Sequence, residues 1–199
     1  MRSVWIPRIG PPKVLEIREV PDVHAGPGEV RIRVAASGVN FADVMARMGL
    51  YPDAPKLPCV VGYEVSGTID EVGAGVSLDV AHPAPRAGDQ VITPTRFNGY
   101  ADLVVVPAAQ VVPLPDGMSF TEGAAIPVNY LTAILMLEVL GNVRRGDRVL
   151  IHGAAGGVGL AAVQLCRLYG AEIIGTASAS KHAALRGAGV AHTIDYRTQ

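Results

Sequence analysis

The sequence predicts an α/β protein in which a β-rich part, residues 1–120, is followed by a part of alternating strands and helices, residues 121–199. Three observations favour this architecture. All fifteen prolines lie at or before Pro127 and none lies after it. In the first part, short β-rich runs are separated by turn residues. A glycine-rich loop in the second part joins an apolar run to a helical pattern. The second part therefore resembles half of a doubly wound parallel sheet.

The first part contains several short strands. In residues 29–36, Val30 and Ile32 alternate with Arg31 and Arg33, which is the period of a half-buried strand. Further strands are expected in residues 60–72, 90–94, 100–106 and 110–113. Many short strands separated by turn residues are typical of a β-barrel or a β-sandwich.

A helix is expected to begin after Ser119. Ser119 and Glu122 have the spacing of a capping box, in which each side chain bonds a free amide at the start of a helix. The helix should end at Gly141. The apolar run within it, residues 124–140, contains a proline, an asparagine and a glutamate, and is slightly short for a membrane span. We therefore expect a buried helix.

The remaining residues predict a β-α-β-α-β unit. Strands are expected at residues 148–152, 172–176 and 192–195. The helix between the first two strands has apolar residues at i, i+3, i+4 and i+7, beginning at Val158. A second helix is expected at residues 181–187.

The loop after the first of these strands carries Gly153, Gly156 and Gly159. Glycines allow a tight turn and let backbone amides approach a pyrophosphate at the helix N-terminus. The alternative is a tight strand-to-helix turn without a ligand. The surrounding strand, helix and second strand favour a dinucleotide site. An ATP-binding P-loop is excluded in its usual form, because Leu160 follows Gly159 where a Lys-Ser/Thr pair should stand.

The residues after the second strand favour NADPH over NADH. An NAD site normally has an acidic residue about 20 residues beyond the loop, and the sequence has none there. It has Ser178 and Lys181 instead, whose hydroxyl and ammonium could hold a 2′-phosphate. In the alternative interpretation these are ordinary capping and surface residues.

Composition limits the remaining functions. The sequence has seventeen basic and eighteen acidic side chains, and this balance of charge gives no electrostatic reason to bind nucleic acid. Cys59 and Cys166 lie far apart in apolar surroundings, which indicates buried thiols and a cytoplasmic protein. The N-terminal residues 1–20 contain three prolines and no continuous apolar core, and so do not resemble a signal peptide.

The sequence resembles the medium-chain dehydrogenase/reductase superfamily, in its zinc-free quinone oxidoreductase branch, and is most similar to the vesicle amine transport protein group. The resemblance covers the whole chain. The segments that carry it are residues 38–43 (GVNFAD), 48–52 (MGLYP), 62–64 (GYE), 87–89 (AGD), 129–133 (NYLTA), 152–159 (HGAAGGVG), 175–181 and 194–196.

The resemblance implies a GroES-like catalytic domain over residues 1–120 and a partial Rossmann NADP-binding domain over residues 121–199. It also implies roles for residues that the sequence alone would leave open, since Asn40 could be a turn residue and Tyr51 a surface aromatic. Asn40 and Thr132 would contact the nicotinamide end, and Tyr51 would face the substrate. The implied cofactor-binding residues are Thr132, Ala155, Gly156, Gly157, Val158 and Gly159 at the nicotinamide and pyrophosphate, and Ser178, Lys181 and Tyr196 at the 2′-phosphate.

No metal is expected. Zinc-dependent members of the superfamily have a cysteine near position 40 and a histidine near position 63, where this sequence has Asn40 and Tyr63. The five histidines show no ligand spacing.

The family resemblance also implies that the chain is incomplete at its C-terminus. Family members continue well beyond Gln199 and use the additional residues to finish the Rossmann sheet and to form dimer contacts. A homodimer is therefore expected only when that half is present.

These observations predict an NADPH-dependent reductase that transfers hydride to a small quinone or an α,β-unsaturated carbonyl compound. One alternative is an enoyl-thioester reductase, in which Tyr51 would act as the general acid. Another is a catalytically silent nucleotide-binding or interaction protein.

Overall fold

The computed structural model describes residues 1–76 and 84–198. The chain forms two units, Met1–Pro127 and Val128–Gln199, each of which is described here by itself. The sequence places this boundary at residue 120.

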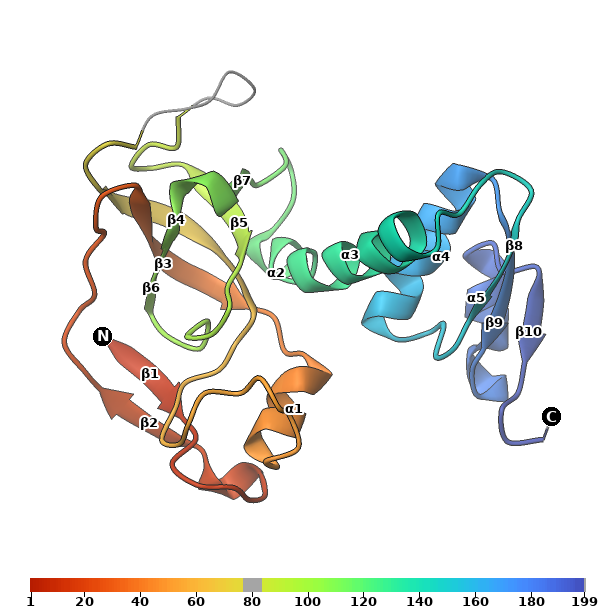
Figure 1. Ribbon diagram of the computed structural model, residues 1–199, viewed down its shortest axis with the longest axis horizontal. Helices are drawn as coiled ribbons and strands as arrows, with labels where there is room; N and C mark the ends of the chain where they lie inside the picture. The colour runs from red at the N-terminus through yellow and green to blue at the C-terminus, as the bar shows by residue number, and fades with distance from the viewer. Residues whose placement is uncertain (77–83, 199) are drawn as a thin grey trace. The chain divides into compact units, whose positions relative to one another are not determined.

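The first unit is built on a five-stranded antiparallel sheet with the order β6-β3-β4-β5-β7 (Figure 1). Its strands are β3 (Glu29–Ser37), β4 (Glu64–Val72), β5 (Gln90–Pro94), β6 (Leu103–Pro107) and β7 (Val112–Pro113). Their inward side chains form one hydrophobic cluster. The buried members of this cluster are Val30, Ile32, Val65, Ile69, Val91, Val104 and Val106. The predicted alternation at Val30 and Ile32 is therefore confirmed, because both side chains are fully buried.

Three strands differ from the sequence prediction at their ends. β4 begins at Glu64 rather than residue 60, because Gly62 adopts φ +104°, in the left-handed region that interrupts a strand. A Cβ at Gly62 would lie 2.7 Å from the backbone nitrogen of Tyr100, so only glycine fits. β6 begins at Leu103 instead of residue 100, and the short 3-10 helix η2 (Ala108–Gln110) delays β7.

Several elements of the first unit were not predicted. β1 (Arg2–Trp5) and β2 (Glu16–Glu19) pair as an antiparallel hairpin, with the 3-10 helix η1 (Pro12–Val14) between them. The helix α1 (Phe41–Arg47) follows β3. These elements are short, and the prolines around β1 and β2 hide their alternation. Backbone bridges from Ser3 to Ala101 and from Ile6 to Cys59 attach the hairpin to the rest of the unit.

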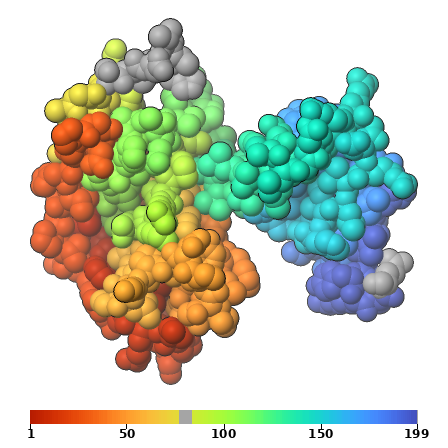
Figure 2. All heavy atoms as spheres, in the orientation of Figure 1, coloured from red at the N-terminus to blue at the C-terminus, as the bar shows by residue number. Residues whose placement is uncertain are grey.

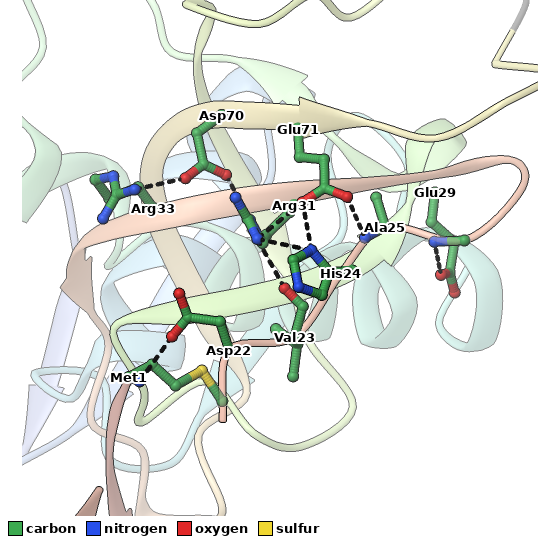
Figure 3. Close-up of polar contacts among 11 residues, drawn as sticks. Met1, Asp22, Val23, His24, Ala25, Glu29, Arg31, Arg33, Asp70 and Glu71 are labelled. Atoms are coloured by element: carbon green, nitrogen blue, oxygen red, sulfur yellow. Dashed lines mark hydrogen bonds and ion pairs between the residues drawn. The ribbon is translucent and has the colours of Figure 1, made fainter. Parts of the chain in front are cut away.

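Charged side chains hold the segment before β3 against β3 and β4 (Figure 3). The N-terminal ammonium of Met1 contacts Asp22 at 2.7 Å. The Arg31 guanidinium contacts Asp70 and Glu71, each at 2.8 Å. Surface ion pairs of this kind contribute little individually, so the network mainly fixes the path of the chain.

The predicted helix after Ser119 forms in three consecutive segments. The capping box of Ser119 and Glu122 is confirmed at the start of α2 (Phe120–Gly123). α3 (Pro127–Ile134) and the π-helix η3 (Leu135–Leu140) follow, and η3 ends at Gly141 as expected. The break before α3 arises because proline lacks an N–H and disfavours helical geometry in the residue before it.

The second unit contains a parallel sheet with the order β10-β9-β8. Its strands are β8 (Arg148–Ile151), β9 (Glu172–Thr176) and β10 (His192–Ile194), joined through α4 (Gly157–Tyr169), the 3-10 helix η4 (Ala179–Lys181) and α5 (His182–Gly187) (Figure 1). The predicted β-α-β-α-β unit is therefore confirmed. Its hydrophobic core includes Ile151, Val163, Cys166, Ile173 and Leu185.

The prediction that residues 124–140 form a buried helix was wrong. Leu131, Val139 and Leu140 are 52%, 69% and 74% exposed, and Figure 2 shows this segment at the surface. Of this stretch, Ala133 and Leu137 lie among the buried residues of the second core. Apolar composition can indicate a helix, but the burial of that helix depends on which other elements pack against it, and composition does not specify them. By length and mean hydropathy, Phe120–Leu140 is the one helical segment among the described residues that could cross a membrane, a test that core helices of soluble proteins also pass.

The exposed apolar side chains predict self-association of the 199-residue chain when it is prepared alone, because contiguous apolar surface favours contacts that remove it from water. Sedimentation velocity should show a size that increases with concentration. The double substitution Val139→Lys and Leu140→Lys should reduce the association. As a control, Ile17→Lys, at an exposed position of the first unit, should reduce it less. A chain that stays monomeric at all concentrations would contradict this prediction.

Two helical glycines should respond oppositely to alanine. A Cβ at Gly159 would lie 2.7 Å from the Ala154 Cα, whereas a Cβ at Gly187 would meet nothing within 4 Å. We expect Gly159→Ala to lower the free energy of unfolding by about 1 to 3 kcal/mol through overpacking. Gly187→Ala should raise it by up to about 1 kcal/mol through helix propensity. Urea denaturation measures both values, and equal changes would show that the close approach at Gly159 is unimportant.

Candidate functional site

The candidate residues fall into two groups, one in each unit. Asn40 and Tyr51 belong to the first unit. The second unit contains the group proposed to bind the cofactor: Thr132, Ala155, Gly156, Gly157, Val158, Gly159, Ser178, Lys181 and Tyr196. Each group is described within its own unit.

In the first unit, Asp43 connects the start of α1 to the loop before β4. Asp43 is 5% exposed, and its Oδ2 accepts a hydrogen bond from the Asn40 backbone N–H at 2.8 Å. Its Oδ1 accepts one from the Gly62 N–H at 2.9 Å. Burial raises the pKa of the Asp43 carboxyl above its usual value, and these two bonds and Tyr100 partly oppose that rise. The candidate residue Asn40 is therefore anchored through its backbone by a buried acid.

The Asn40 side chain is held by a second buried acid, Glu64. The Asn40 Nδ2 donates to Glu64 Oε1 at 2.8 Å, and Glu64 is 1% exposed. The contact directs the nitrogen end of the Asn40 amide toward Glu64. Asn40 is the N-cap residue of α1, and the Asp43 bond belongs to a capping box, so the contact with Glu64 is the one that goes beyond an ordinary helix start. Sequence analysis included Asp43 and Glu64 in motifs but did not recognise them as site residues.

Tyr51 packs in an aromatic cluster rather than standing alone at the surface. Its ring lies 5.9 Å from the ring of Tyr63, at an interplanar angle of 78°. The Phe97 ring lies 5.5 Å from the Tyr63 ring, at an interplanar angle of 60°. All three side chains are partly buried. An edge-to-face arrangement of this kind stabilises the rings and leaves aromatic surface for a flat unsaturated molecule.

In the second unit, the predicted glycine loop joins β8 to the N-terminus of α4. Gly153 turns the chain with φ +63°, and its N–H donates to Thr176 Oγ1 at 3.1 Å. α4 begins after Gly156 without a side-chain cap and without an acidic residue in its first turn. The first amides of any helix lack intrahelical acceptors, and here no side-chain cap takes their place. Such a helix start can bind a phosphate group. Gly156 and Gly157 are exposed, so an anion can reach this helix end.

Close packing around the loop explains two of its glycines. Gly159 lies against Ala154, where a side chain would not fit. A Cβ at Gly157 would lie 2.5 Å from the Asn129 Oδ1, so Asn129 borders the loop. Thr132, which is partly buried, lies one helical turn beyond Asn129 on α3. Sequence analysis did not select Asn129, although it lies in the same motif as Thr132.

The other cofactor candidates lie at the carboxyl ends of β9 and β10. The Ala177 N–H donates to the Ile194 carbonyl at 3.0 Å, which ties these two strand ends together. Ser178 precedes η4, Lys181 ends it and is exposed, and Tyr196 follows β10 with 58% exposure. Arg197, which sequence analysis missed, places its guanidinium carbon 5.7 Å from the Tyr196 ring. Two cations therefore accompany the hydroxyls near this edge of the sheet.

Among residues 1–76 and 84–198, no three histidine, cysteine, aspartate or glutamate side chains are grouped so that they could hold a metal ion. The absence of a metal remains a prediction from the side chains at positions 40 and 63.

Comparison with known proteins agrees with this arrangement. The alcohol dehydrogenase GroES-like domain family matches residues 26–116. The synaptic vesicle membrane protein VAT-1 homolog of Rattus norvegicus is 49% identical over 174 residues, which are 87% of this chain and 42% of the rat protein.

Two solved structures are also similar. The CurK enoyl reductase superposes with a TM-score of 0.89 at 36% identity, over 99% of this chain and 60% of that one. The Escherichia coli quinone oxidoreductase complexed with NADPH gives 0.89 at 32% identity, over 100% of this chain and 60% of that one.

This chain thus spans about half the length of the curated relatives that it matches. The likeness nevertheless extends through both units, because nearly the whole chain is covered in each comparison. The expected GroES-like fold followed by a partial Rossmann unit is confirmed. The chain belongs to the medium-chain dehydrogenase/reductase superfamily, in its quinone oxidoreductase-like branch.

Proposed function

We propose that this chain is part of an NADPH-dependent reductase that transfers hydride to a quinone or an α,β-unsaturated carbonyl compound. The observation that carries the proposal is the exposed, uncapped N-terminus of α4 at the end of a glycine-lined loop. Free amides at a helix N-terminus, with a β-α-β-α-β unit around them, suit the pyrophosphate of a dinucleotide.

The residues of the second unit fit NADPH in this proposal. The amides of residues 155–159 would hold the pyrophosphate, and Thr132 would contact the nicotinamide end. Ser178, Lys181 and Tyr196 would meet the 2′-phosphate, with Arg197 as a further cation close to Tyr196. NADPH, when bound, supplies a hydride. The alternative remains that Ser178 and Lys181 are ordinary capping and surface residues.

The residues of the first unit would act on the acceptor. Asn40, fixed by Asp43 and Glu64, would orient the reacting groups, and Tyr51 would face the substrate. Holding two reacting carbons close together in the correct orientation can account for a large share of the rate enhancement, so few acid-base residues are needed. The similarity to an enoyl reductase keeps the enoyl-thioester alternative open. In that alternative Tyr51 would donate a proton to the substrate α-carbon.

The proposal includes no metal and no nucleic acid, and its partner is a small molecule. We place the protein in the cytoplasm and expect a homodimer only in a longer chain. A catalytically silent nucleotide-binding protein would bind NADPH without oxidising it. NADPH oxidation, measured on the longest natural form of the protein with quinones, enones and enoyl thioesters, separates these functions. Consumption with quinones or enones supports the proposal, and binding without consumption contradicts it.

The substitution Lys181→Ala tests the cofactor assignment. We expect the free energy of NADPH binding to become about 1 to 3 kcal/mol less favourable, because one charge-assisted contact to the 2′-phosphate is lost. NADH affinity should stay nearly unchanged, since NADH has no 2′-phosphate. Fluorescence titration measures both, and Lys13→Ala in the first unit is a matched control that should alter neither. An equal loss of affinity for NADPH and NADH would show that Lys181 does not contact the 2′-phosphate.

The substitution Tyr51→Phe tests the acceptor. Reduction of a quinone leaves charge on oxygen atoms that solvent can protonate, whereas reduction of an enoyl thioester needs a placed acid at carbon. We expect quinone turnover to stay within about tenfold of the parent, or about 1.4 kcal/mol. Steady-state kinetics with saturating NADPH measures this ratio. A thousandfold loss on the best acceptor, with NADPH binding intact, would favour the enoyl reductase.

A further inference from the structure

The hydroxyls of Tyr63 and Tyr100 are buried and form no hydrogen bond of normal geometry within the described part of the chain. The Tyr63 hydroxyl lies near Tyr51, whereas the Tyr100 hydroxyl lies near Asp43. Buried hydroxyls are nearly always hydrogen-bonded, because an unsatisfied one loses its water without compensation. Such an exception in a native protein indicates a bound water, a ligand or a functional role. The Tyr63 hydroxyl is therefore expected to have a hydrogen-bond partner when the site is occupied.

Tyr63 is held in place from several sides. Its backbone carbonyl accepts the Thr95 N–H at 2.7 Å. Gly62, the preceding residue, donates to Asp43. The Tyr63 ring contacts the rings of both Tyr51 and Phe97, with centroid distances of 5.9 Å and 5.5 Å. The ring is therefore fixed, and it lies directly beside the candidate substrate-facing residue Tyr51.

The environment of Tyr63 also keeps its hydroxyl protonated. Burial raises the pKa of the Tyr63 phenol well above its usual value, and the neighbouring Tyr51 and Asp43 raise it further. Tyr63 therefore presents an O–H donor beside Tyr51 at any pH at which the protein functions. Tyr51 is only partly buried, so its side chain has room to adjust when a ligand closes over it.

We propose that Tyr63 is the positioning residue for Tyr51: its O–H donates a hydrogen bond to the Tyr51 phenol oxygen and thereby orients the Tyr51 hydroxyl toward the acceptor. Hydrogen bonds at catalytic sites are often long in ligand-free proteins and tighten when the substrate binds. Donation to a hydroxyl oxygen also strengthens the bond that this hydroxyl donates in turn. Tyr63 keeps its own proton throughout. This inference rests on the proposed role of Tyr51 facing the substrate.

The substitution Tyr63→Phe tests this role, because it keeps the ring and removes only the hydroxyl. If Tyr63 served packing alone, the substitution would leave turnover unchanged. We expect Tyr63→Phe to lower kcat by about threefold to tenfold, the scale of one neutral hydrogen bond, without changing the KM for NADPH. The double variant with Tyr51→Phe should be no slower than Tyr51→Phe alone, because both changes interrupt the same path. Tyr100→Phe removes a second buried phenol, which lies near Asp43 instead of Tyr51, and is the matched control. Its effect should multiply with that of Tyr51→Phe.

A measurement that does not depend on turnover completes the test. Carbon-13 labelling of tyrosine rings allows the Tyr51 phenol carbon to be followed by NMR with NADPH and a quinone present. Tyr63→Phe should shift this resonance, and Tyr100→Phe should leave it in place. An unchanged resonance, or independent kinetic effects of Tyr51 and Tyr63, would overturn the inference. A shifted resonance together with unchanged quinone turnover in both Tyr51→Phe and Tyr63→Phe would support the contact and contradict its part in turnover.

Discussion

The two hydrogen bonds that Asp43 accepts from backbone amides are the interaction on which the first half of the site depends. One amide belongs to Asn40 at the start of α1, and the other to Gly62 in the loop that leads into β4. Since Gly62 also turns the chain ahead of Tyr63, the same carboxyl relates Asn40 to the aromatic cluster. An apolar replacement for Asp43 would leave two amides without acceptors, so the arrangement needs a hydrogen-bond acceptor at this position.

The second unit depends on close approach between α4 and its preceding loop. Gly159 is buried and lets the helix lie against Ala154, whereas Gly156 and Gly157 at the start of the helix are exposed. The unit thereby combines a packed core, through residues such as Val163 and Ile173, with an exposed anion-binding end. The same helix therefore packs one face into the core and presents its exposed first residues to a ligand.

Sequence patterns predict the regular parts of this protein because those parts have strong local periodicity. The strand at Val30 and Ile32, the cap at Ser119 and the β-α-β-α-β unit all follow from such patterns. Contacts between distant residues have no comparable signal: the bond from Asn40 to Glu64 joins two motifs across 24 positions. The exposure of Val139 and Leu140 likewise depends on which elements cover the helix, which composition does not determine. Asp43 and Glu64 became visible as site residues only through the folded chain.

The central claim is that the second unit binds a dinucleotide that carries a 2′-phosphate, and paired dissociation constants test it most directly. Calorimetric titration of the unsubstituted protein with NADPH and then with NADH isolates the contribution of that phosphate. We expect NADPH to bind at least about tenfold more tightly than NADH, which corresponds to about 1.4 kcal/mol of binding free energy. Added salt should reduce this difference in affinity, because it screens the charge of the 2′-phosphate. Equal affinities, or a preference for NADH, would contradict the account.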